Sequence, residues 1–279
     1  MKKRGRPSKQ IQPLMKVTID FSQITKLSQL NLDPKMLEIM PSGRKQLDEF
    51  ISHEGGIPCS TNVMVIGDPG VGKTTVLLDL MASVQNKGRK CLFISGEMGR
   101  KQMYKYTKRF PQFGIIDTLF LSDYLEYNTK DVVEQVMDGG YDLILIDSIA
   151  EVLDGVRDDM GWDRKTAESW LVGQCLKNNK GGNKMNKYTS FLLIQQVTKS
   201  GEFQGSNKLK HMTDATLEMR RESSREGGGT YMYFSKNRNG QAGIKFTYML
   251  GNSEIQYGTL IEEVEEDEEE SKEGYSLNS

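Results

Sequence analysis

The sequence predicts an α/β fold, with a mostly parallel central sheet flanked by helices and antiparallel strands at one edge. Over the first two thirds of the chain, short apolar runs alternate with longer helical patterns, as in successive β-α units. The last third instead has β-type runs without long helices between them, which indicates antiparallel strands.

The expected elements follow in that order. A short helical lead-in is expected at 28–40. Helices are expected at 44–53, 74–85, 100–110, 130–138 and 166–177, and strands at 62–66, 91–95, 118–121, 143–146 and 191–195. The three runs assigned to the antiparallel edge are 215–219, 231–235 and 244–249.

Charge separates the ends of the chain from its middle. The chain has 279 residues with 37 Lys+Arg and 38 Asp+Glu, a size that suits one medium domain or two small ones. Residues 1–9 carry five positive charges, whereas residues 262–273 carry nine carboxylates and one lysine, which leaves about +2 for the rest. We therefore expect a disordered basic arm at 1–27, a folded domain at 28–258 and a disordered acidic tail at 259–279.

Composition also excludes several classes of protein. No apolar run approaches the roughly 18 residues of a membrane-spanning helix, and the basic start leads into no secretory core. We expect a cytoplasmic protein without a membrane partner, nucleoid-associated or in the host cytoplasm if encoded by a phage. Its three cysteines are too few and too far apart for a disulfide framework or a four-cysteine zinc module.

The strongest motif runs from Gly67 to Thr74 and reads Gly-Asp-Pro-Gly-Val-Gly-Lys-Thr, which matches G-x-x-x-x-G-K-[ST] between an expected strand and an expected helix. Backbone N–H groups of such a loop converge on phosphates, and the helix start adds its positive dipole end. Lys73 supplies a charge for the β/γ-phosphates of ATP, and Thr74 a hydroxyl for Mg²⁺. The expected nucleotide contacts are Gly67, Asp68, Pro69, Gly70, Val71, Gly72, Lys73, Thr74 and Thr75.

Two acidic residues follow expected strands. Asp147 closes the apolar run 143–146, where a carboxylate suits a position pointing toward the phosphates. Glu97 ends the segment Phe-Ile-Ser-Gly-Glu and is a candidate base for water. An ordinary acid at a helix N-terminus is the alternative for Glu97.

These motifs carry a family likeness that covers about residues 41–249. Gly67 to Thr74, Ser-Gly-Glu at 95–97, Leu-Ile-Asp-Ser at 145–148 and the segment 196–214 resemble the RecA-type ATPase core, and bacterial RadA/Sms above all. Ser-Gly-Glu-Met at 95–98 and Lys-Asn-Arg-Asn-Gly at 236–240 are also similar to DnaB-type helicases. From this sequence we expect neither the zinc module nor the protease-like domain of RadA, which puts functions of those parts in doubt.

The resemblance implies roles for the polar residues after the strands. It implies that Glu97 activates the attacking water, that Asp147 holds Mg²⁺ through water, and that Gln196 senses the γ-phosphate at the root of a DNA loop. An amide there could lose its phosphate bond on hydrolysis and move the loop. Because Gln195 and Gln196 are adjacent, the register stays open, and a plain polar strand end is the alternative.

Lys236 and Arg238 resemble the cations that such ATPases insert into a neighbouring subunit's site. Two residues apart on a strand point to the same face, and a cation supplied in trans makes hydrolysis depend on assembly. A hairpin turn at Asn239-Gly240 flanked by solvated cations is the alternative.

The expected nucleic-acid contacts are basic loops. The loop at 198–210 contributes Lys199, Phe203, Lys208 and Lys210, and the loop at 177–187 adds four lysines. Solvated loops are the alternative. The basic arm resembles an AT-hook at 3–7, and a solvated basic terminus is the alternative. Both tails are candidate sites for a single-strand-binding or replication partner.

Together these features predict a DNA-stimulated ATP hydrolase, with ATP and Mg²⁺ as its cofactors. It would act as a homo-oligomer, a ring hexamer or a helical filament, on single-stranded or branched DNA in recombination, repair or replication. A DnaB-type replicative helicase, a RecA-like strand-exchange recombinase and a regulatory RecA-fold ATPase indifferent to DNA are the alternatives.

Overall fold

The computed structural model describes residues 20–195, 207–222 and 228–263. The chain divides into two units, residues 1–33 and 34–279. In the first, two 3-10 turns are formed, Phe21–Gln23 and Leu27–Gln29. The expectations for the basic arm at 1–19 and for the tail beyond 263 lie outside the described residues. Within them, no helix is both long and apolar enough to span a membrane.

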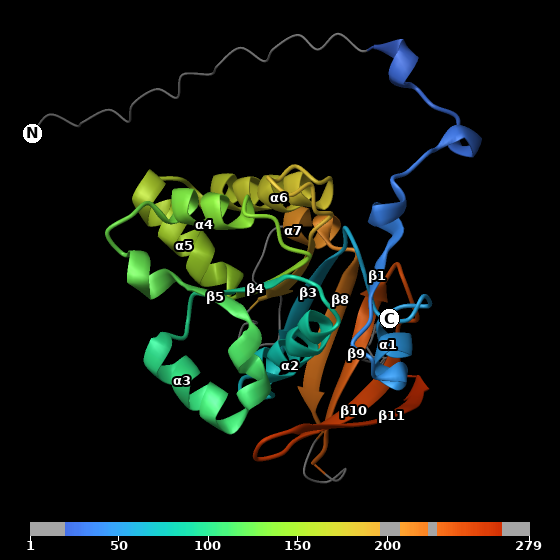
Figure 1. Ribbon diagram of the computed structural model, residues 1–279, viewed down its shortest axis with the longest axis vertical. Coiled ribbons are helices and arrows are strands. Elements are labelled where there is room, and N and C mark those ends of the chain that lie inside the picture. The colour runs from blue at the N-terminus through green and yellow to red at the C-terminus, as the bar shows by residue number, and fades with distance from the viewer. Residues whose placement is uncertain (1–19, 196–206, 223–227, 264–279) are drawn as a thin grey trace, which may run out of the picture. The chain divides into compact units, whose positions relative to one another are not determined.

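A single twisted sheet organises the second unit (Figure 1). In the described part of the chain it has nine strands in the order β11-β10-β9-β8-β3-β7-β6-β4-β5. The strands from β8 to β5 are parallel, and β8 through β11 are antiparallel to one another. The bounds are β3 (Asn62–Gly67), β4 (Cys91–Ser95), β5 (Asp117–Phe120), β6 (Leu143–Asp147), β7 (Ser190–Ile194), β8 (Ala215–Arg221), β9 (Thr230–Asn237), β10 (Ile244–Leu250) and β11 (Ile255–Glu263).

Helices cover both faces of this sheet (Figure 1). The bounds are α1 (Lys45–Ile51), α2 (Lys73–Asn86), α3 (Arg100–Arg109), α4 (Thr129–Met137), α5 (Ile149–Met160), α6 (Arg164–Asn179) and α7 (Asn207–Met212). Short 3-10 turns lie at Pro34–Leu37, Pro111–Ile115 and Leu121–Tyr124, and β1 (Ile39–Met40) pairs with β2 (Ile57–Pro58).

Alternation along the strands divides the core into two layers. Val63 and Val65 of β3 pack with apolar residues of α1, α2 and α3, whereas Met64 and Ile66 pack with those of α4 to α7. Successive side chains of a strand point to opposite faces, so a strand covered on both faces must be apolar throughout. This is why β3, β4, β6 and β7 are buried at every position.

The structure confirms the mostly parallel sheet with antiparallel edge strands and corrects several elements. The run at 215–219 is not purely an antiparallel edge strand, because β8 pairs in parallel with β3 and only its other side is antiparallel. The lead-in at 28–40 forms 3-10 turns and the short strand β1 rather than a helix. Helix α5 and strand β11 were not expected.

Candidate nucleotide-binding site

The glycine-rich loop connects β3 to α2, in the context that its motif requires. Gly67 has φ +150°, and a Cβ there would lie 2.0 Å from the Met219 carbonyl oxygen of β8. Gly72 precedes the first residue of α2 with φ +97°. Both positions require glycine, because L side chains rarely adopt such φ values. Helix α2 therefore begins at Lys73 with its N-terminus facing the loop.

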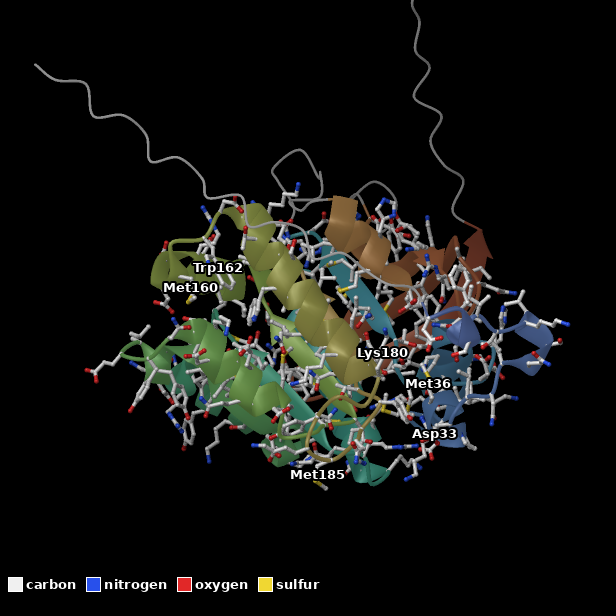
Figure 2. The ribbon with its side chains drawn as sticks, turned by 90° about the horizontal axis from the view of Figure 1, so that it is seen from above. Asp33, Met36, Met160, Trp162, Lys180 and Met185 are labelled. Atoms are coloured by element: carbon white, nitrogen blue, oxygen red, sulfur yellow. The ribbon has the colours of Figure 1, made fainter. Side chains whose placement is uncertain are left out.

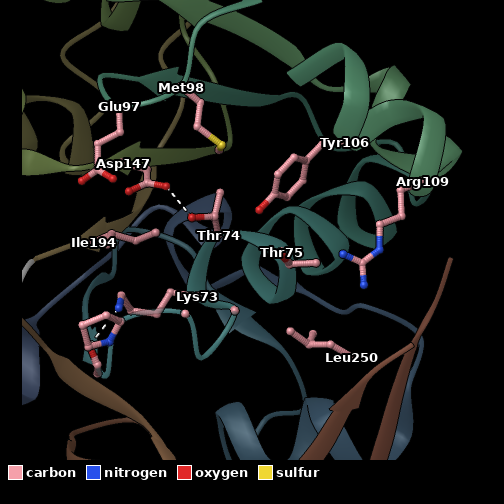
Figure 3. Close-up of a pocket in the computed structure, with 14 residues that line it drawn as sticks. Lys73, Thr74, Thr75, Glu97, Met98, Tyr106, Arg109, Asp147, Ile194 and Leu250 are labelled. Atoms are coloured by element: carbon pink, nitrogen blue, oxygen red, sulfur yellow. Dashed lines mark hydrogen bonds between the residues drawn. The ribbon is translucent and has the colours of Figure 1, made fainter. Parts of the chain in front are cut away.

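A pocket of about 640 Å³ opens over this loop (Figure 3). It lies at the carboxyl ends of the parallel strands, where open α/β sheets bind their ligands. Its lining residues are Gly67, Pro69, Gly70, Gly72, Lys73, Thr74, Thr75, Glu97, Met98, Tyr106, Arg109, Asp147, Ile194 and Leu250. The loop, Glu97 and Asp147 thus meet in one cavity.

Two loop residues expected as nucleotide contacts direct their side chains elsewhere. The Asp68 carboxylate contacts the Arg220 guanidinium at 3.2 Å and accepts a hydrogen bond from the Arg221 backbone N–H at 3.2 Å. Val71 is buried, and its carbonyl accepts a hydrogen bond from the Tyr248 hydroxyl. Their backbone N–H groups are engaged as well, since that of Asp68 donates to the Met219 carbonyl oxygen at 3.2 Å and that of Val71 to the Asp68 carbonyl oxygen at 3.4 Å. A phosphate contact by either residue would have to replace one of these bonds.

Asp147 closes β6 beside the start of α2. The Thr74 hydroxyl donates a 2.5 Å hydrogen bond to Asp147 Oδ2. Burial raises the pKa of Asp147 to about 6, partly opposed by the Thr74 hydrogen bond and by the charge of Lys73. The cis peptide bond between Asp147 and Ser148 follows directly.

Lys73 is held within the loop itself. Its ammonium donates to the carbonyl oxygens of Gly67 at 2.8 Å and Asp68 at 3.0 Å. Burial lowers the pKa of Lys73, although the carboxylates of Asp147 and Asp68 oppose this change. A phosphate arriving in the pocket would offer this cation a stronger, charged acceptor than two carbonyls.

Glu97 follows β4, and the backbone around it is hydrogen-bonded to β6. The Gly96 backbone N–H donates to the Asp147 carbonyl oxygen at 2.7 Å, and the Glu97 N–H reaches the same oxygen at 3.4 Å. The Glu97 side chain is exposed and lines the pocket next to Asp147 (Figure 3).

The residues present fit a magnesium ion. Mg²⁺ prefers oxygen ligands, keeps several waters, and is usually held by one or two protein groups together with substrate phosphates. Thr74 and Asp147 bring a hydroxyl and a carboxylate together at the mouth of the loop. When bound, the ion would neutralise charge on the phosphates, with Thr74 and Asp147 holding it.

Five further residues line the pocket and were not predicted from the sequence. Met98 follows Glu97, Ile194 ends β7, Tyr106 and Arg109 come from α3, and Leu250 ends β10 (Figure 3). The Arg109 guanidinium also donates to the carbonyls of Gly251 and Asn252 at 2.7 and 2.9 Å, which ties α3 to the β10–β11 turn. In the sequence, only the i, i+3 spacing of Tyr106 and Arg109 could have indicated that these two side chains lie on the same face of the helix after Glu97.

Lys236 and Arg238 lie near the amino ends of the parallel strands, whereas the phosphate-binding loop lies at their carboxyl ends. Lys236 Nζ donates to the Thr213 carbonyl at 2.5 Å, and Arg238 contacts the Asp214 carboxylate at 3.4 Å. Asp214 also accepts from the backbone N–H of Asn62, the first residue of β3. Since β3 spans six residues, the amino end of the strand lies roughly 17 Å from the loop.

The expected nucleic-acid contacts are only partly within reach. Gln196, Lys199 and Phe203 lie outside the described residues. Lys208 and Lys210 were expected in a loop, but they lie in helix α7. Gln195, the neighbour of Gln196, is fully buried, whereas Ile194 lines the pocket.

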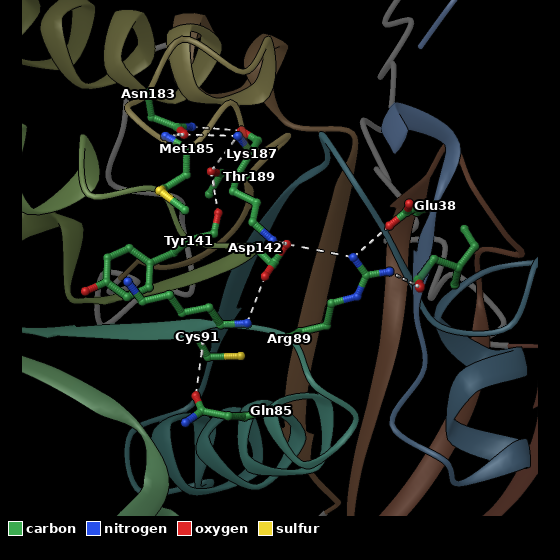
Figure 4. Close-up of polar contacts among 12 residues, drawn as sticks. Glu38, Gln85, Arg89, Cys91, Tyr141, Asp142, Asn183, Met185, Lys187 and Thr189 are labelled. Atoms are coloured by element: carbon green, nitrogen blue, oxygen red, sulfur yellow. Dashed lines mark hydrogen bonds and ion pairs between the residues drawn. The ribbon is translucent and has the colours of Figure 1, made fainter. Parts of the chain in front are cut away.

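The lysines of the loop at 177–187 largely have acidic partners. Lys177 and Lys184 contact Asp138 at 3.3 and 3.7 Å. Lys187 contacts Asp142 at 2.9 Å (Figure 4). Lys180 lies where α6 ends (Figure 2). These ion pairs reduce the positive charge that this loop can offer to a phosphate backbone.

Comparison with known proteins places this site in a family. A family model described as the RecA N-terminal domain matches residues 12–238. The chain belongs to this family. It is a RecA-superfamily ATPase core that resembles RadA, as the motifs in its sequence predicted.

Two relatives illustrate the resemblance. The chain is 30% identical over 213 residues to the DNA repair protein RadA of Streptococcus pyogenes, and 26% identical over 217 residues to that of Mycobacterium tuberculosis. The alignments cover 75% and 77% of this chain but only 42% of each relative. The chain thus spans less than half the length of the curated relatives that it matches.

A solved structure shows the fold alone. A KaiC-like protein from the archaeon Pyrococcus horikoshii superposes with a TM-score of 0.60 at 17% sequence identity, covering 80% of this chain and 99% of the other.

Proposed function

We propose that the chain is the ATP-hydrolysing core of a RadA-like, DNA-stimulated motor. It works as an oligomer on single-stranded or branched DNA in recombination, repair or replication. The observation that carries this proposal is the position of Lys236 and Arg238 at the amino ends of the parallel strands, at the other end of β3 from Lys73. Cations so placed are too far away to act on their own pocket, so they suit the pocket of another copy.

The chemistry assigned to each residue follows from the pocket. Lys73 leaves the Gly67 and Asp68 carbonyls to neutralise charge on the β/γ-phosphates. The Glu97 carboxylate takes the proton of the attacking water. Arg238 and Lys236 of another copy stabilise the charge that develops on the transferred phosphoryl group. Hydrolysis therefore occurs where two copies meet.

Gln196 is proposed to couple this reaction to DNA. It follows Ile194 by two positions, and Ile194 lines the pocket, which favours Gln196 over the buried Gln195 as the side chain facing the γ-phosphate. The expected loop that it precedes carries the proposed DNA contacts Lys199 and Phe203, and helix α7 after it carries Lys208 and Lys210. Loss of a phosphate contact on hydrolysis would shift this loop and move the bound strand.

Two variants test where the site is completed. Lys73→Ala is expected to abolish nucleotide binding or turnover. Arg238→Ala is expected to bind ATP normally yet lose about a thousandfold in turnover, the effect of removing an arginine finger. Arg157→Ala is the control, because Arg157 contacts Asp154 within α5. Its turnover should be unchanged.

Mixing experiments separate action in trans from action in cis. Subunits with Arg238→Ala still have Glu97, and subunits with Glu97→Gln still have Arg238. Mixed oligomers should therefore regain part of the DNA-stimulated turnover that each variant lacks. Full-rate hydrolysis by an isolated monomer, or turnover that ignores added oligonucleotide, would refute the proposal.

A further inference from the structure

We propose that the outer face of α3, defined by Lys101, Tyr104, Lys105 and Lys108, binds single-stranded nucleic acid. This surface is separate from the loop at 198–210, and the inference rests on the proposed function, because it names a second contact for the same nucleic-acid partner.

The face is set by helical spacing. Lys101, Tyr104, Lys105 and Lys108 stand at i, i+3, i+4 and i+7, so they form one stripe along the helix. All four are exposed, and Tyr104 keeps 62% of its surface in solvent. Met103 and Phe110 face the core instead. An exposed aromatic ring among cations is thus fixed on a rigid element.

The charge of this face is not compensated. Helix α3 contains five cations and no acidic residue. Arg100 contacts Asp123 at 2.6 Å, and Arg109 donates to backbone carbonyls. In contrast, none of the three stripe lysines has a carboxylate within ion-pair distance among the residues that the structure describes. The loop at 177–187 is the opposite case, since Asp138 and Asp142 hold three of its lysines.

The ligand class follows from combining these groups. Lysines one helical turn apart, over about 10 Å from first to last, suit consecutive phosphates of a backbone rather than one anion. Lys108 Nζ lies 5.2 Å from the centroid of the Tyr104 ring, which keeps the ring and the charge together. A ring exposed beside a cationic track is the arrangement on which unpaired bases stack, and bases within a duplex are not available for it.

Helix α3 also forms part of the wall of the nucleotide pocket. Tyr106 and Arg109, on another side of the same helix, line the nucleotide pocket (Figure 3). A nucleic-acid strand bound to the outer face of α3 would therefore be separated from the site of hydrolysis by this one helix.

The test measures binding of a labelled single-stranded oligonucleotide to the full chain by fluorescence anisotropy over a series of salt concentrations. Each phosphate contact on a single strand contributes about 0.7 to the slope of log K against log salt. The triple variant Lys101→Gln, Lys105→Gln, Lys108→Gln is therefore expected to reduce this slope by about 2. The control is Lys45→Gln, Lys130→Gln, Arg157→Gln, which removes the same charge from cations that have acidic partners and lie outside the expected nucleic-acid contacts. It should keep the slope.

Variants of the ring test stacking independently of charge. Tyr104→Ala is expected to weaken binding on the order of tenfold, whereas Tyr104→Phe keeps the ring and should bind as the wild type does. Tyr127→Ala removes another exposed tyrosine, outside α3, and should have no effect. A similar loss for Tyr104→Phe would show that stacking is not the cause.

The outcomes distinguish the inference from the function on which it rests. A wild-type chain that binds no oligonucleotide overturns the proposed function. Wild-type binding with the same salt slope in both triple variants overturns only the α3 contact. Loss of self-association rather than of oligonucleotide binding in the α3 variant would make this face a contact between copies, and would also overturn the inference.

Discussion

Glu218 links two strands to the phosphate-binding loop through its carboxylate. It accepts hydrogen bonds from the Arg220 guanidinium at 2.7 Å and from the Tyr233 hydroxyl at 2.9 Å. Arg220 in turn contacts Asp68 at 3.2 Å. Burial alone would raise the pKa of Glu218, but the hydrogen bonds from Arg220, Ser235 and Tyr233 outweigh it and lower the pKa.

Glu218→Gln should therefore destabilise the fold in a pH-dependent way. A carboxyl with a lowered folded-state pKa stabilises the protein above its unfolded pKa, and this stabilisation disappears as the pH falls through the folded value. The variant should lose about 1–3 kcal/mol of unfolding free energy at neutral pH and clearly less near pH 3. Urea unfolding at both pH values measures this. Glu49→Gln is the control, since Glu49 is exposed and pairs with the exposed Lys45 at 3.8 Å. Equal losses at both pH values would exclude the ionised carboxylate as the cause.

The sequence could predict the residues of the site that lie in or directly after an apolar strand. Lys73, Thr74 and Asp147 meet in the pocket because the carboxyl ends of parallel strands share one edge. Leu250 could not be placed there, because it depends on the pairing of β10 far along the chain. The outward turn of the Asp68 side chain likewise depends on Arg220 and Arg221 of β8, about 150 residues away.

Among the elements, buried strands were predicted best and the surface helix α5 was missed. Strands buried on both faces are continuous apolar runs and stand out in a sequence. Helix α5 is amphipathic, and its acidic exposed residues made 149–160 look like a polar connection. Strand β8 was assigned to the antiparallel edge because no long helix separates the β-type runs in the last third of the sequence. Its parallel pairing with β3 joins strands far apart in the sequence and cannot be read from the local residue pattern.

The junction of β3 and β8 offers a test of how closely these elements approach. Gly67→Ala would place a Cβ 2.0 Å from the Met219 carbonyl oxygen, which also accepts the Asp68 backbone N–H. Gly88→Ala is a matched control, because Gly88 also has a positive φ but open space around it. The control should lose about 1–2 kcal/mol from its backbone conformation. Gly67→Ala should lose several kcal/mol more, or fail to fold, as measured by thermal unfolding. Equal losses in the two variants would mean that β8 can move away.

Across the whole domain, the buried Asp79 carboxylate of α2 joins segments from both ends of the sequence. The Arg44 guanidinium, before α1, lies 2.9 Å away, and the Tyr257 hydroxyl of β11 donates at 3.0 Å. Gln112 donates at 3.3 Å. Arg44 also lies over the Tyr257 ring, 5.0 Å from its centroid. A single acid thus connects positions that are more than 200 residues apart.

Asp79→Ala is expected to destabilise the domain by about 1–3 kcal/mol. It leaves the Tyr257 hydroxyl without its acceptor and removes the carboxylate partner of Arg44, which is 38% exposed and still donates to the Ser83 hydroxyl. Since the contacts join distant segments, the loss should appear as one cooperative transition at lower denaturant, with an unchanged slope. A double-mutant cycle with Tyr257→Phe should give a coupling energy of about 0.5 kcal/mol or more. Additive losses would show that the two side chains do not interact in solution, and a separate early transition would show that β11 unfolds independently of α2.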